Sequence, residues 1–206
     1  MVALGPQDAQ RLERCLARDG VALLPTDTVY GLACDARSEL AARRLYALKQ
    51  RPAERPAAVM FLTLEAALEA LPELEPQEQR ALRALLPGPV TVLLPNRRAR
   101  FAPACGPEPG VLGLRVPALP EPLAALAALT RPLMQSSANL SGGPDARRLE
   151  DIEPQLRASV DVELDGGELP GVASTVLDLT RYASDAAWSV VREGPLTHGR
   201  LRDLLC

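Results

Sequence analysis

Short apolar runs alternate with segments of helical periodicity along the whole chain of 206 residues. The runs at 21–24, 57–62, 90–94 and 111–116 have the length of buried strands, and most are bounded by Pro or Gly. None reaches the roughly 18 residues that a membrane-spanning helix needs. Strands and helices are interspersed without a break in composition, which predicts an α/β fold.

The same patterns predict the remaining elements. Apolar residues at helical spacing predict helices over 8–19, 38–49, 64–71, 76–86, 121–129 and 197–205. Further strands are predicted at 133–136, 160–164, 174–179 and 188–192, and 96–110 has the Arg, Pro and Gly content of a loop. Because strands and helices do not alternate strictly, we expect a mixed sheet in a single domain over residues 1–206.

Charge and cysteine usage exclude several classes of protein. The net charge of -3 argues against a large constitutive nucleic-acid surface. The charged N-terminal segment 1–20 is unlike a secretory signal, so we expect a cytoplasmic protein without membrane attachment. The four cysteines form no CxxC pair, which predicts neither a zinc site nor a disulfide framework. The single histidine, His198, lies near the C-terminus, where a surface position is expected.

Lysine usage singles out one segment. Of the 23 Lys and Arg residues only one is a lysine, Lys49, in the sequence Lys49-Gln50-Arg51-Pro52. A compact ammonium in an arginine-rich chain indicates a site that the planar guanidinium does not suit. If the segment is extended, Lys49 and Arg51 face the same side and can reach one polyphosphate. We then expect loss of Lys49 to reduce turnover with little change in melting temperature. The alternative is a solvated basic helix end.

Two polar segments follow predicted strands. Pro25-Thr26-Asp27-Thr28-Val29-Tyr30-Gly31-Leu32 places short polar side chains at a strand end, where α/β proteins collect ligands. Ser136-Ser137-Ala138-Asn139-Leu140-Ser141-Gly142-Gly143 carries hydroxyl and amide groups that suit phosphate and ribose oxygens. Ordinary Asp/Thr and Ser/Gly turns are the alternatives. Neither a P-loop nor a dinucleotide-binding glycine motif is present.

Three further polar residues lie in predicted strands: Arg115, Ser174 and Arg192. An arginine within an apolar strand is costly unless it is paired with an anion. That anion is either a ligand or the carboxylate of a structural salt bridge.

The order of these segments is specific. PTDTVYGL, KQRP, PGPVTVLL, LGLRVP, SSANLSGGP, STVLDL and VREG follow one another between residues 21 and 194. The chain therefore resembles the YrdC/TsaC family of threonylcarbamoyl-AMP synthases, in its short, single-domain form. The resemblance implies a twisted mixed sheet with helices around a deep, positively charged cavity. It also implies synthesis of threonylcarbamoyl-AMP and pyrophosphate from L-threonine, bicarbonate and ATP, for modification of tRNA.

Residue by residue, the resemblance assigns Lys49, Arg51, Ser137, Asn139 and Arg192 to ATP, with Lys49 and Arg51 also catalytic. It assigns Thr28, Arg115 and Ser174 to threonine. Mg²⁺ accompanies ATP without a dedicated protein ligand. The expected partners are the downstream proteins that transfer the threonylcarbamoyl group, and contact with tRNA is at most weak or transient.

Three departures concern the shape of the threonine pocket: Ala57 after Pro56, Gln135 before the SSAN segment, and Met60. They leave open a same-fold paralogue with a different carbamoyl substrate, such as the carbamoyl phosphate used by hydrogenase-maturation carbamoyltransferases. A non-catalytic RNA-binding member of the fold is the other alternative, with Arg97, Arg98, Arg100, Arg147 and Arg148 as a basic rim.

Overall fold

The computed structural model describes residues 2–50, 52 and 55–205. Within them, a nine-stranded mixed sheet has the order β7-β1-β2-β6-β3-β5-β4-β8-β9. The strands are β1 (Ala22–Leu24), β2 (Gly31–Asp35), β3 (Ala58–Met60), β4 (Val90–Pro95), β5 (Val111–Arg115), β6 (Leu133–Ser137), β7 (Val162–Glu163), β8 (Thr175–Asp178) and β9 (Ser189–Arg192). The prediction of an α/β fold with a mixed sheet is confirmed.

The longer helices agree with the predicted ones. They are α1 (Pro6–Leu16), α2 (Glu39–Leu48), α3 (Leu64–Ala70), α4 (Pro76–Leu85) and α8 (His198–Leu205). Ser38 caps α2 and Thr63 caps α3, since each side chain accepts a hydrogen bond from a backbone N–H in the first turn. The predicted helix at 121–129 is instead a 3₁₀ helix, η1 (Glu121–Ala128).

Several short elements were not predicted. They are β2 and four helical turns, α5 (Ala102–Cys105), η2 (Leu149–Asp151), α6 (Pro154–Arg157) and α7 (Tyr182–Asp185). Each of these helical turns has only three or four residues, too few to show a helical period in the sequence. No helix within the described ranges is both long enough and apolar enough to traverse a bilayer.

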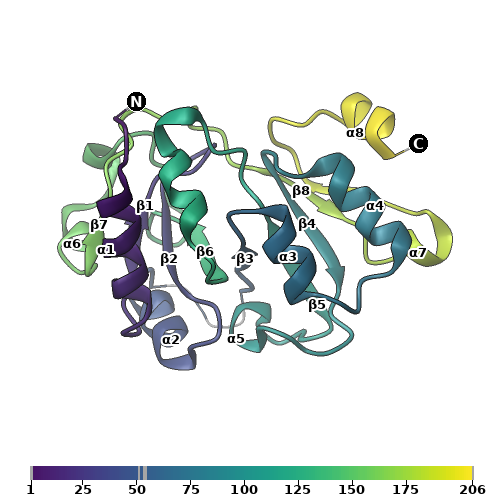
Figure 1. Cartoon of the computed structure of the whole chain (residues 1–206), viewed down its shortest axis with the longest axis horizontal. Coiled ribbons are helices and arrows are strands. Elements are labelled where there is room, and N and C mark those ends of the chain that lie inside the picture. Colours follow the sequence, from purple (N-terminus) through teal and green to yellow (C-terminus); the bar gives the residue numbers. More distant parts are fainter. Residues whose placement is uncertain (1, 51, 53–54, 206) are drawn as a thin grey trace.

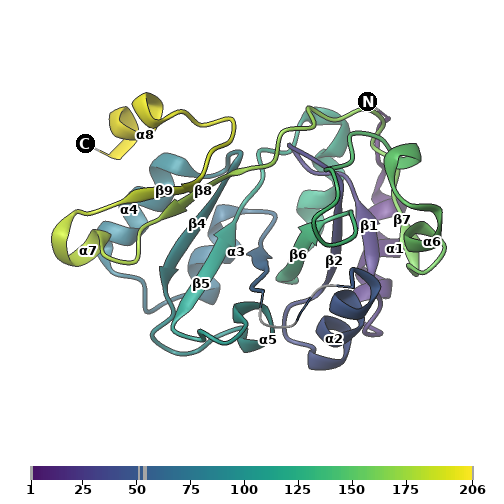
Figure 2. The ribbon, with the colours of Figure 1, turned by 180° about the vertical axis from the view of Figure 1, so that it is seen from behind.

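The two faces of the sheet are covered differently. One face buries Leu32, Val59 and Leu114 in the larger core, to which α2, α3 and α4 contribute. The opposite face packs against α1 and η1 at the β1–β2–β6 end. Toward β4, β5, β8 and β9, that second face is not covered by helices, as the view from behind shows (Figure 2). The helices α3 and α4 lie on the other side of these strands (Figure 1).

Candidate functional site

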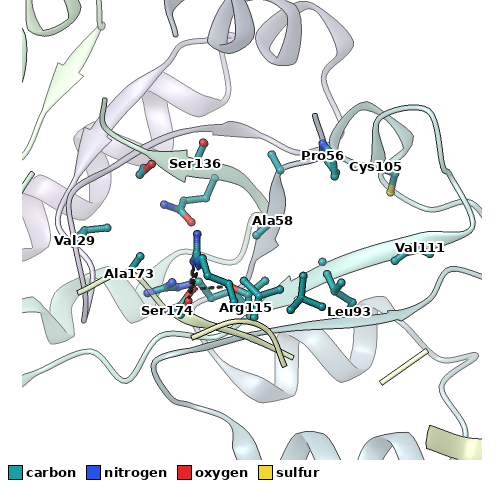
Figure 3. A pocket seen from close by; sticks show the side chains of 18 of the residues that line it. Val29, Pro56, Ala58, Leu93, Cys105, Val111, Arg115, Ser136, Ala173 and Ser174 are labelled. Atoms are coloured by element: carbon teal, nitrogen blue, oxygen red, sulfur yellow. Dashed lines mark hydrogen bonds between the residues drawn. The ribbon is translucent and has the colours of Figure 1, made fainter. Parts of the chain in front are cut away.

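A cavity of about 350 Å³ lies on this open part of the sheet. Its lining comes from β3, β4, β5, β6, β8 and β9 together with the loops that follow β1 and β6. Val29 and Ala173 lie at one end of the cavity, and Cys105 and Val111 lie at the other (Figure 3). Segments far apart in the sequence therefore meet around one hollow.

The floor of the cavity consists of one row of residues across four strands. Gln135 of β6 pairs with Ala58 of β3, Ala58 with Gly113 of β5, and Gly113 with Leu93 of β4. Paired residues point to the same face of a sheet, and all four line the cavity. Because the two central members are Ala and Gly, the middle of the sheet carries almost no side-chain volume. The cavity owes its depth to this gap.

Arg115 stands at the end of β5 and is held by the loop after β1. Its side chain is only 4% exposed. The Nη2 group donates to Oδ1 of Asp27 at 2.5 Å and to the Thr28 hydroxyl at 2.6 Å. Asp27 is itself fixed, because its other carboxylate oxygen accepts from the backbone N–H of Ala118 at 3.0 Å. The salt bridge expected for an arginine in an apolar strand is therefore present, with Asp27 as the carboxylate.

This pairing uses only one nitrogen of the guanidinium. Nε of Arg115 is buried without an acceptor, and Nη1 makes no hydrogen bond to any described residue. Burial lowers the pKa of Arg115, while the nearby Asp27 charge opposes that shift and Arg192 reinforces it. A second anion at the unused nitrogens would compensate the remaining desolvation cost. Arg115 is thus a buried cation whose Nη1 is available to a ligand.

Ser174, directly before β8, links two strands beside the cavity. Its hydroxyl lies 2.9 Å from that of Thr91 on β4. Arg192 of β9 donates from Nη2 to the Ser174 carbonyl at 2.7 Å and to its hydroxyl at 3.2 Å. Ser174 and Arg115 lie close together on one side of the cavity (Figure 3). Arg192 is exposed, and these hydrogen bonds to Ser174 fix the orientation of its guanidinium.

The SSAN segment continues β6 into a tight polar loop. The Ser137 hydroxyl donates to Oδ1 of Asn139 at 2.8 Å, and the Asn139 amide in turn donates to the Gly143 carbonyl. Ser137 lines the cavity. The loop therefore holds Ser137 and Asn139 in fixed orientations at one edge of the hollow.

Lys49 lies beneath that loop. Its side chain is 1% exposed, and Nζ donates to the carbonyls of Ser137 and Asn139 and to Oδ1 of Asn139. An ammonium suits this position, because three donors radiate from one atom. The buried position was not expected from the sequence, which favoured contact of Lys49 with a polyphosphate and left a solvated basic helix end as the alternative.

The segment after α2 is also not extended as expected. Lys49 ends the helix in a helical conformation, and Gln50 has a left-handed φ of 49°. This is a common helix C-terminus, and it turns the chain. The prediction of an extended segment is therefore wrong at Lys49 and Gln50. Arg51 lies outside the described residues.

Most of the predicted site residues converge. Thr28 is hydrogen-bonded to Arg115 and Ser174 to Arg192, while Lys49 and Ser137 are hydrogen-bonded to Asn139 in the SSAN loop. Asp27, Thr91 and Gln135 were not predicted as site residues. Asp27 lies inside the PTDT segment, and the presence of an acid there was the available signal. Gln135 was noted only as a departure that concerns the shape of the threonine pocket, and Thr91 carried no signal that sequence spacing could reveal.

His198 takes no part in the site. It stacks on Trp188 with ring centroids 4.8 Å apart, and it does not line the cavity. Within the described residues no group of three His, Cys, Asp or Glu side chains is arranged to hold a metal ion.

Comparisons with known proteins show the family of the chain. The model of the Sua5/YciO/YrdC family, described as "Telomere recombination", matches residues 14–194. The chain belongs to this family. A threonylcarbamoyl-AMP synthase of Xanthomonas euvesicatoria is 35% identical over 161 residues, which cover 77% of this chain and 86% of that protein.

Two solved structures of the Sua5/YciO/YrdC family share the fold. The Pyrococcus abyssi Sua5 protein, crystallised with L-threonine, superposes with a TM-score of 0.81 at 27% identity. That match covers 98% of this chain and 58% of the longer Sua5 chain. Escherichia coli YciO superposes with a TM-score of 0.78 at 26% identity, covering 97% of this chain and 95% of YciO.

Proposed function

We propose that this protein is an L-threonylcarbamoyladenylate synthase, which makes threonylcarbamoyl-AMP and pyrophosphate from L-threonine, bicarbonate and ATP. The observation that carries the proposal is Arg115, a buried cation beside Thr28 with two guanidinium nitrogens unused by the protein. A free amino acid supplies the carboxylate that such a group requires. The family relatives named for this reaction support the same assignment.

The threonine end of the site is assigned to Arg115, Thr28 and Ser174. The guanidinium would pair with the threonine carboxylate through Nη1, which makes no hydrogen bond to a described residue. The hydroxyls of Thr28 and Ser174 can each donate and accept, so they suit the amine and hydroxyl of the substrate. Thr91 orients Ser174 through the 2.9 Å contact between their hydroxyls.

The nucleotide end is assigned to Ser137, Asn139, Arg192, Lys49 and Arg51. Arg192 would meet phosphate oxygens through Nη1, the guanidinium nitrogen that Ser174 leaves unused, and Ser137 also lines the cavity. Lys49 supports this end from below, through the two carbonyls that it holds. Lys49 would then contribute to catalysis partly by positioning the SSAN loop.

The reaction needs positioning and charge neutralisation more than proton transfer. The threonine amine and bicarbonate give a carbamate and water. A carbamate oxygen then attacks the α-phosphorus of ATP, the new P–O bond forms, and the bond to the β-phosphate oxygen breaks. Pyrophosphate leaves with that electron pair. Negative charge gathers on phosphate oxygens, which fixed cations and N–H donors stabilise.

Mg²⁺ is proposed to enter with ATP, held by phosphate oxygens and water. The product would pass to proteins that transfer the threonylcarbamoyl group to tRNA, with direct tRNA contact weak or transient. A cytoplasmic location accords with that role, because the tRNA substrate is found there.

The decisive test is pyrophosphate release by the purified protein with ATP, Mg²⁺ and bicarbonate. We expect release that depends on L-threonine and falls by about 10- to 200-fold with L-serine, which lacks the methyl group. L-Valine, which lacks the hydroxyl, should also be poor. Release driven by carbamoyl phosphate and indifferent to threonine would contradict the proposal and favour the paralogue.

A further inference from the structure

Gln135 carries a buried amide that the protein does not use. It sits in the middle of β6, between Ala33 of β2 and Ala58 of β3, and is 7% exposed. The amide makes no hydrogen bond within the described residues. Its oxygen and nitrogen are nevertheless not fully buried, so a ligand in the cavity can reach them. Since the residue lines the cavity, the amide is available to whatever the cavity holds.

Gly31 gives the Gln135 side chain its place. A Cβ on Gly31 would lie 2.4 Å from Nε2 and 3.2 Å from the amide carbon of Gln135. Such contacts are far closer than van der Waals distance, so the side chain lies directly over the glycine backbone. The position of the amide is thus set by two strands together.

Gln135 also lies between the two ends of the proposed site. Leu133, Gln135 and Ser137 lie on the cavity face of β6, in three successive rows across the sheet. Leu133 is in the row of Met60 and Arg115, and Gln135 is in the floor row. Ser137 is in the row of Gly31. Neighbouring rows are about 6.8 Å apart, because two strand residues separate them. The threonine end is therefore one row to one side, and the nucleotide end one row to the other.

The other three members of the floor row are Ala58, Gly113 and Leu93. None of their side chains can form a hydrogen bond. Gln135 is therefore the one side chain of this row that can hydrogen-bond to a ligand, and its amide extends over Gly31, toward the row of Ser137.

We propose that the Gln135 amide binds the carbamate of N-carboxylated threonine and holds it toward the α-phosphorus of ATP. The inference rests on the proposed function. The two amide N–H groups suit the carbamate oxygens, and the amide oxygen suits the carbamate N–H. L-Threonine alone presents an ammonium there, which can use only the amide oxygen, so the carbamate makes the larger number of hydrogen bonds with the amide.

The test compares wild type with Gln135→Met, which keeps the side-chain length and removes the amide. We measure pyrophosphate release while varying bicarbonate, threonine and ATP separately, and record melting temperatures. Loss of a hydrogen bond to a charged group lowers an affinity or a rate by about 10- to 150-fold. We expect a loss of that size in turnover at low bicarbonate, with the ATP requirement and the melting temperature little changed. Gln135→Thr provides a smaller second variant.

Binding gives a readout without turnover. By calorimetry, wild type should bind N-carbamoyl-L-threonine, a neutral analogue of the carbamate, about 2- to 13-fold more tightly than Gln135→Met does, with L-threonine affinity similar in both. Equal affinity for N-carbamoyl-L-threonine and equal bicarbonate dependence in the two proteins would overturn the inference alone. A wild-type protein without threonine-dependent pyrophosphate release would overturn the proposed function, and this inference with it.

Discussion

The two sides of the cavity each contain a buried cation, and the two cations are held in opposite ways. Arg115 contacts side chains, a carboxylate and two hydroxyls, through one nitrogen. Lys49 contacts two backbone carbonyls and one amide oxygen through its only nitrogen. Arg115 therefore keeps donors for a ligand, whereas Lys49 directs its charge into the loop that forms the wall. Arg115 is thus the cation proposed to bind a ligand, and Lys49 is the cation that stabilises the SSAN loop.

The largest effect is expected at Lys49. Lys49→Met keeps the stem and removes the ammonium, which leaves three buried acceptors without their donor. We expect a loss of about 3–5 kcal/mol in unfolding free energy, by analogy with a broken buried pair, and a fall in turnover of orders of magnitude. Urea unfolding and pyrophosphate release measure the two effects. A fully active, fully stable Lys49→Met protein would contradict the role assigned to this lysine.

At Arg115 the effect should be selective. Arg115→Lys keeps a charge beside Asp27 but loses the fork that a carboxylate needs. We expect the threonine concentration for half-maximal rate to rise by about 10- to 150-fold, with the ATP requirement nearly unchanged. Asp27→Asn is the matched control, since it weakens the salt bridge while leaving the fork. Equal losses for both substrates would instead indicate a structural salt bridge.

The smallest expected effect is a pH dependence of stability that arises from two buried thiols, Cys15 and Cys34. Burial raises the pKa of the Cys15 thiol to about 11 and that of Cys34 to about 12, from an ordinary value of 9.0. Both thiols stay protonated in the folded protein up to a pH at which the unfolded chain has ionised. They therefore leave stability unchanged below pH 9 and reduce it as the pH rises from 9 toward 11.

Thiol labelling and urea midpoints at pH 8 and pH 10.5 test this point, with Cys34→Ala as the comparison. The variant should lose less stability at the higher pH. Equal labelling rates in folded and urea-unfolded protein would show that the thiols are not enclosed. The result would show how far burial alone raises the pKa of a group without strong partners, in contrast to the two hydrogen-bonded cations.

Much of this arrangement follows from the sequence. The apolar runs predicted β1, β3, β4, β5 and β6, because each is a largely buried stretch with Pro or Gly on at least one side. By contrast, β2 was missed. Its sequence Gly31-Leu32-Ala33-Cys34-Asp35 contains no β-branched residue and follows a polar turn, although it lies between β1 and β6 in the sheet.

The site was predictable as a set of segments but not as a set of contacts. Asp27 and Arg115 are 88 residues apart, and only the sheet register brings them together. The burial of Lys49 likewise depends on where the SSAN loop closes, which no local pattern encodes. The expectation that its loss would spare the melting temperature therefore changes, since the side chain is 1% exposed.

The floor formed by Ala58 and Gly113 has a thermodynamic consequence. A sheet centre is normally filled by large side chains, and this one leaves its packing incomplete on one face. The bound substrates complete it, so occupancy and folding are linked. At one hundred times its Kd, a ligand adds about 2.7 kcal/mol to the unfolding free energy, or roughly 5–10 °C in a chain of this size. Substrate supply would then regulate the lifetime of the protein as well as its rate.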